Sequence, residues 1–132
     1  MNINKVNKLV KENVVGSRVQ VSVETGVHWL IKCKYEINKN YIQPTHINPE
    51  SISWFVKTEN NTYVFVYFHP KSVYNTPEPV CNIVITEPFV KNEIGGINTK
   101  YDSLSFLDEL LSNVYMNTGV KLNYDCFGKL VK

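Results

Sequence analysis

The stretch that most constrains the fold is TYVFVYFH, residues 62 to 69, because large apolar side chains occupy both of its parities. Successive side chains of an extended strand point to opposite faces of a sheet. The two faces of this strand are occupied, respectively, by Tyr63, Phe65 and Tyr67 and by Val64, Val66 and Phe68. The pattern therefore predicts a central strand that is either covered on both sides or covered on one side and available for binding on the other.

The same stretch resembles part of the signature of the RNA-recognition motif, in which strands stack aromatic rings on bases. The aromatic and valine positions of that signature are matched by Tyr63, Phe65, Val66 and Phe68. The basic, glycine and small positions are instead occupied by Asn61, Thr62 and Val64. The motif also requires a helix between its first two strands, where this sequence predicts a direct hairpin. We therefore interpret the stretch as a core strand and assign the chain to no family.

Alternating apolar and polar residues predict further strands around this segment. Residues 17 to 24 and 27 to 37 each alternate and are separated by an ETG turn, so they predict a β-hairpin. Residues 51 to 57 and 62 to 69 flank Glu59-Asn60-Asn61 and predict a second hairpin, since Asn tolerates the backbone of a tight turn.

Three other segments complete the chain between the predicted helices and strands. Residues 80 to 87 predict one more strand, and residues 120 to 124 predict a short last strand. The segment 38 to 50 contains two prolines, which predict a polar loop without regular pairing. The segment 88 to 100 has no hydrophobic period and contains Gly95-Gly96, so we expect a mobile loop that becomes ordered on binding.

Helical periodicity marks two segments. Residues 3 to 14 place apolar residues on one side of a helical wheel and Lys5, Lys8 and Lys11 on the other. A second helix is expected to begin at Asp102 or Ser103 and to run to Gly119. Its apolar stripe consists of Leu104, Leu107, Leu111, Val114 and Tyr115. The central leucines of that stripe, at 107 and 111, are predicted to dock on the sheet.

Together these segments predict a single α+β domain spanning residues 1–132. Its core would be a mainly antiparallel sheet of about five to six strands with an N-terminal helix and a C-terminal helix packed on it. The start of the chain lacks the apolar run of a signal peptide, and no segment has the apolar length of a membrane span. We therefore expect a soluble protein that lies in the cytoplasm, either of its own cell or of a host cell.

Composition narrows the class of function. The net charge is only +2 and Arg18 is the only arginine, so the chain is poorly equipped for base-specific recognition of nucleic acid. The absence of alanine and the abundance of Asn, Lys, Ile and Tyr are typical of AT-rich codons, as in some bacteria, phages and viruses.

Groups that carry chemistry are few in this sequence. The three cysteines have no close pair and are expected to be reduced, and the three histidines lack the spacing of a metal site. We predict no catalytic residues, cofactor or metal. One arrangement stays open: His69 and Cys81 could meet if their strands pair.

Three functions remain in view. The favoured hypothesis is a non-catalytic protein-binding domain, such as a phage or mobile-element protein that inhibits or assembles with a larger protein. Its predicted partner-binding residues are Phe55, Tyr63, Phe65, Tyr67, Ile94, Gly95 and Gly96. Phe55 is expected to be the exposed anchor of that surface because it shares a parity with Ser53 and Lys57.

The alternatives belong to other classes. A nucleic-acid-binding protein would use Lys5, Lys8 and Lys11 together with the rings at 63, 65 and 67. A small hydrolase or nuclease would use His69 with another titratable group.

Overall fold

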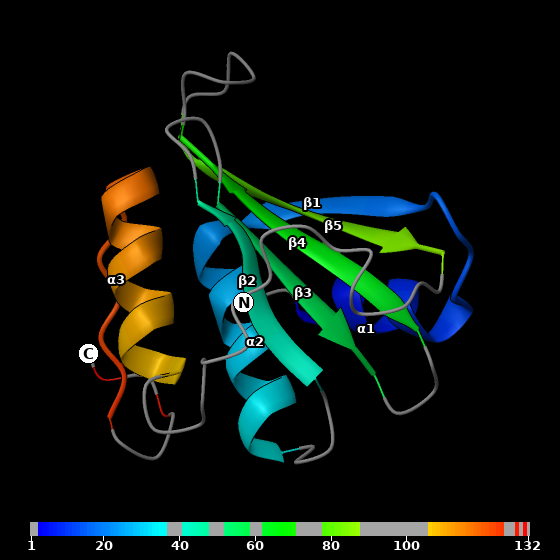
Figure 1. Cartoon of the computed structure of the whole chain (residues 1–132), viewed down its shortest axis with the longest axis horizontal. Helices are drawn as coiled ribbons and strands as arrows, with labels where there is room; N and C mark the ends of the chain where they lie inside the picture. Colours follow the sequence, from blue (N-terminus) through cyan, green and yellow to red (C-terminus); the bar gives the residue numbers. More distant parts are fainter. Residues whose placement is uncertain are drawn as a thin grey trace.

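The structure, a computed structural model, consists of helices on one antiparallel sheet (Figure 1). It describes residues 3–36, 41–47, 52–58, 62–70, 78–87, 106–125, 129 and 131. The helices of this part of the chain are α1 (Ile3–Glu12), α2 (Val23–Glu36) and α3 (Phe106–Thr118). The predicted α+β class is confirmed.

The sheet has the strand order β1-β5-β4-β3-β2, with every neighbouring pair antiparallel. The described strands are β1 (Arg18–Ser22), β2 (Tyr41–Ile47), β3 (Ile52–Lys57), β4 (Tyr63–His69) and β5 (Val80–Thr86). Strands β2 to β5 follow one another as neighbours, and β1 is added beside β5. The aromatic strand β4 is central, as its two apolar parities predict, and the predicted hairpin of β3 and β4 is confirmed.

The predicted hairpin between residues 17 and 37 is wrong, because helix α2 follows β1 directly. Ser22 caps this helix: its hydroxyl oxygen accepts a hydrogen bond from the backbone nitrogen of Thr25 at 3.1 Å. A strand would have placed Leu30 on a polar face, whereas the helix buries it completely. The RNA-recognition motif requires a helix after its first strand, and this chain has one. This criterion therefore no longer distinguishes the chain from that motif, but the mismatched signature positions still do.

The predicted loop at 38 to 50 is also wrong in part, because residues 41 to 47 form strand β2. This strand contains Pro44 and lies at an edge of the sheet. An edge strand tolerates proline because one side of its backbone has no neighbour to pair with. The pairing with β3 shifts register between Pro44 and His46, which is typical of a β-bulge.

Near the C-terminus the predictions need two corrections. In α3 the side chains of Leu107, Leu110 and Val114 are buried, while Leu111 is only partly buried and Tyr115 is 51% exposed. The buried stripe is therefore rotated about the helix axis toward Leu110. Residues 120 to 124 form no strand of the sheet in the described part of the chain, where Tyr124 makes a single bridge. The predicted loop at 88 to 100 lies outside the described residues.

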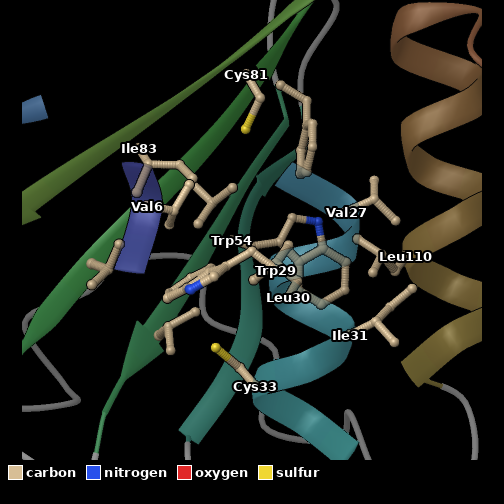
Figure 2. Close-up of a cluster of buried hydrophobic side chains, with 14 of the residues drawn as sticks. Val6, Val27, Trp29, Leu30, Ile31, Cys33, Trp54, Cys81, Ile83 and Leu110 are labelled. Carbon is tan, nitrogen blue, oxygen red and sulfur yellow. The ribbon is translucent and has the colours of Figure 1, made fainter. Parts of the chain in front are cut away.

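The core lies between the helices and one face of the sheet (Figure 2). Helices α1 and α2 contact β1 and β5, and α3 contacts β3 and β4. The strands contribute one parity each to this core, and their fully buried core residues are Trp54, Val56, Val64, Val66, Phe68, Cys81, Ile83 and Ile85. The other parity faces away from these helices.

Candidate functional site: the aromatic row

A row of rings lies on the face of the sheet opposite the described helices. Cross-strand partners share a face, and Phe55 of β3 pairs with Phe65 of β4. Along β4 the side chains of Tyr63, Tyr67 and His69 share the parity of Phe65. We call these five residues the aromatic row.

Contacts between neighbouring rings are continuous along the row. The centroid distances are 5.8 Å for Phe55–Tyr63, 5.5 Å for Phe55–Phe65, 5.6 Å for Phe65–Tyr67 and 6.1 Å for Tyr67–His69. All four fall in the range favoured for aromatic pairs, each of which contributes about 0.5–1.5 kcal/mol beyond the burial of its area. The rings therefore hold one another in place.

The rings of the row differ in exposure. Phe55 is 3% exposed and His69 is 7% exposed, whereas Tyr63, Phe65 and Tyr67 are half-buried. The prediction of the face of Phe55 is confirmed, but the prediction that it is the exposed ring is wrong. Parity determines the face to which a side chain points but not how many neighbours surround it on that face. Two rings of β4 flank Phe55 there.

Two described basic residues lie on the face of the row. The Lys57 Nζ atom lies 5.7 Å from the centroid of the Tyr63 ring, within the range of a cation–π interaction, and Lys57 is exposed. Arg18 is exposed on the same face of the sheet, since it pairs with Val84 and Val84 pairs with Phe65. Strands β1, β3, β4 and β5 contain no carboxylate.

The lysines predicted for nucleic-acid binding lie elsewhere. Lys5, Lys8 and Lys11 are exposed on α1, which packs on the opposite face of the sheet from the row. The structure therefore does not join them with Tyr63, Phe65 and Tyr67 in one surface. The other predicted partner-binding residues, Ile94, Gly95 and Gly96, lie outside the described residues.

The possible dyad of His69 and Cys81 is wrong. Cys81 pairs with Phe68, so its thiol lies in the core, while His69 lies in the aromatic row on the other face. Burial raises the pKa of the Cys81 thiol, which keeps it protonated and unreactive. Burial lowers the pKa of His69, which favours its neutral form.

One other group with a shifted pKa belongs to the helical side of the molecule. Burial, together with the charge of Glu24, raises the pKa of Tyr124 to about 12. Among the residues that the structure describes, no three His, Cys, Asp or Glu side chains gather as a metal ion would require.

Two residues at this site were named from the sequence in other contexts and were not assigned to the partner-binding surface. His69 continues the parity of the three β4 rings, and Lys57 is the register partner of Tyr63. The first could have been found by extending the alternation by one step. The second depends on the register of the hairpin, which its turn sequence alone does not define.

Fold and site together define an α+β domain with helices on one face of its sheet and an aromatic row on the other. No protein-family model matches the chain, and comparisons with curated proteins and with solved structures gave no match. Within the described ranges, no helix combines the length and apolar character needed to cross a bilayer.

Proposed function

We propose that this chain is a protein-binding domain and that the aromatic row is its interface. The observation that carries the proposal is the half-buried state of Tyr63, Phe65 and Tyr67 on a face that no described helix contacts. Aromatic residues held rigidly in contact lose little entropy when a partner covers them. Binding would inhibit a larger protein or place this chain in an assembly.

The chemistry of the row suggests the partner surface. Its centre is apolar and aromatic, and its rim carries Lys57 and Arg18 without a carboxylate in the same strands. An apolar patch bordered by Asp or Glu would complement it, because opposite charges at a rim increase the rate and specificity of association.

The first experiment identifies what the row touches. A photo-crosslinking amino acid is placed at Tyr67 in one variant and at Tyr115, an exposed ring of α3, in a matched control. We expect the Tyr67 variant to crosslink to one protein in cells of the native source and the Tyr115 variant not to. Equal crosslinking at both positions, or crosslinks from Tyr67 to nucleic acid alone, would contradict the proposal.

The second experiment measures the energetic role of the row once that protein is purified. Tyr67→Ala should weaken binding by about 1–3 kcal/mol with little dependence on salt, because hot-spot residues act by apolar burial. Tyr115→Ala should leave binding unchanged. A steep loss of affinity with rising salt concentration would favour nucleic-acid binding instead.

Phe55 calls for a different expectation from its neighbours. Since its side chain is 3% exposed between two rings, Phe55→Ala should cost about 3–5 kcal/mol of folding stability. Chemical denaturation of Phe55→Ala and Tyr67→Ala side by side separates support of the row from contact with a partner. Equal stability of Phe55→Ala and the parent would contradict its burial.

A further inference from the structure

The two edges of the sheet differ in their capacity to accept another strand. β2 forms one edge and carries Pro44 and a register shift, both of which hinder strand addition. β1 forms the other edge and has neither feature. Figure 1 shows β1 as the outermost strand on its side.

Backbone geometry around Gly16 sets which groups of β1 point outward. Residues 14 to 17 form a tight turn, in which the Ser17 nitrogen donates to the Val14 oxygen at 3.1 Å. Gly16 has φ 90°, a left-handed conformation that favours glycine. Its nitrogen donates to the Ile85 oxygen at 2.9 Å, and the Ile85 nitrogen donates to the Ser17 oxygen at 2.9 Å. This pattern is a glycine bulge that begins the pairing of β1 with β5.

From that start the hydrogen bonding alternates. Val19 and Val21, two and four residues after Ser17, direct their backbone groups toward β5. Arg18, Gln20 and Ser22 therefore direct their N–H and C=O groups away from the sheet. All three are exposed, and no described residue pairs with this edge.

We propose that the outer edge of β1 pairs with β1 of a second copy of this chain, so that two sheets join across a twofold axis. The sequence RVQVS is symmetric about Gln20 in its three central residues. Antiparallel pairing centred on Gln20 places Gln20 opposite itself, and Val19 opposite Val21 of the second copy. Arg18 then lies opposite Ser22, so no like charges face each other.

The difference between the edges also sets the size of the assembly. A chain with two open edges can add copies without limit, whereas one open edge closes after a single twofold contact. The half-buried Val19 and Val21 would be covered on the helical side of the joined sheet. We therefore expect a dimer and no larger species.

The first test is the molar mass in solution, measured by light scattering over concentrations up to about 1 mM, where even weak pairing is populated. We expect the mass to rise with concentration from the 15.2 kDa of one chain toward twice that value. A mass of one chain at every concentration would overturn the proposal, and so would growth beyond two chains.

The second test uses proline at two adjacent positions. Gln20→Pro removes an outward N–H and should weaken dimerisation at least about tenfold while leaving the pairing with β5 intact. Val19→Pro is the matched control, since it removes a donor to β5 and should lower the thermal stability of the monomer. Undiminished dimerisation of folded Gln20→Pro would overturn the proposal.

A charge exchange at position 20 gives a test that does not depend on proline. Gln20→Lys and Gln20→Glu each place like charges across the twofold axis, so each alone should dimerise at least about tenfold more weakly. Mixing the two should restore dimers that contain one copy of each. Failure to restore them, with both variants folded, would overturn the pairing of β1 with itself. These results do not depend on the aromatic row, so either proposal can fail alone.

Discussion

Gly26 lies where α2 packs against β5 and β4, and a side chain there would have no room. A Cβ atom would overlap the Cys81 sulfur and lie 3.1 Å from Cε1 of Phe68. Both neighbours are fully buried, so neither can move into solvent. The absence of a side chain at position 26 therefore permits the close approach of helix and sheet.

Gly26→Ala should destabilise the fold by about 1–3 kcal/mol through overpacking, despite the better helix propensity of alanine. The matched background is Cys81→Ala, which removes the sulfur that the new methyl group would meet. In that background the same substitution should cost much less, so the two changes should be coupled in a double-mutant cycle. Additive effects in chemical denaturation would show that the sulfur is not the obstacle.

His69 makes the stability of the fold depend on pH. Burial lowers its pKa from the ordinary value of 6.5, so below about pH 6.5 the unfolded chain binds a proton more readily than the folded one. The stability that the neutral form of His69 contributes is complete above about pH 6.5 and is lost as the pH falls below it. His69→Gln should make the decrease in unfolding free energy shallower as the pH falls below about 6.5. An identical decrease in the parent and in His69→Gln would contradict the role of His69.

Helix α2 shows why one element escaped prediction. Its residues Val27, Trp29, Ile31 and Cys33 alternate as a strand would, and the same segment also places Val23, Val27 and Leu30 at helical spacing. Both periods are present in the sequence. In the helical form nearly every described apolar side chain of this segment is buried among the strands and the other helices (Figure 2). The residues buried in this way include Val27, Trp29, Leu30, Ile31 and Cys33.

In α3 the buried residues make a direct prediction. Leu110→Ala should cost about 2–5 kcal/mol, because its side chain is fully buried against the core. Leu111→Ala should cost less, since Leu111 is only partly buried. Met116, at 78% exposed, provides the control, and Met116→Ala should stay within about 0.5 kcal/mol of the parent. Thermal or chemical unfolding of the three variants decides the order, and a larger loss at Leu111 would restore the stripe predicted from the sequence.

At the scale of the molecule, the strands should differ in hydrogen exchange. Among the described strands, β3, β4 and β5 have a neighbour on both sides, whereas β1 and β2 have one. We expect the slowest amide exchange in β4 and β5, and fast exchange at Arg18 and Gln20 in dilute solution, because their N–H groups point outward. Residue-resolved exchange by NMR measures this. Slow exchange at Gln20 in a sample shown to be monomeric would mean that the alternation assigned to β1 is incorrect.

The candidate site could be predicted only in part. Alternation placed Tyr63, Phe65 and Tyr67 on one face, and Phe55 was grouped with them as a further ring of the same surface. This was possible because side-chain direction in a strand is a local property. Exposure is not local: Phe55 is buried, and two rings of the adjacent strand flank it. The separation of Lys5, Lys8 and Lys11 from these rings likewise depends on which face α1 covers.

The sequence by itself determined the α+β class, the terminal helices, the hairpin of β3 and β4, and the central place of β4. Each of these follows from a single period or from apolar residues on both parities of one short segment. Only the tertiary structure decided that residues 23 to 36 are helical and that β1 pairs with β5. Each of these outcomes depends on how whole elements are buried against one another, and such burial involves residues far apart in the chain.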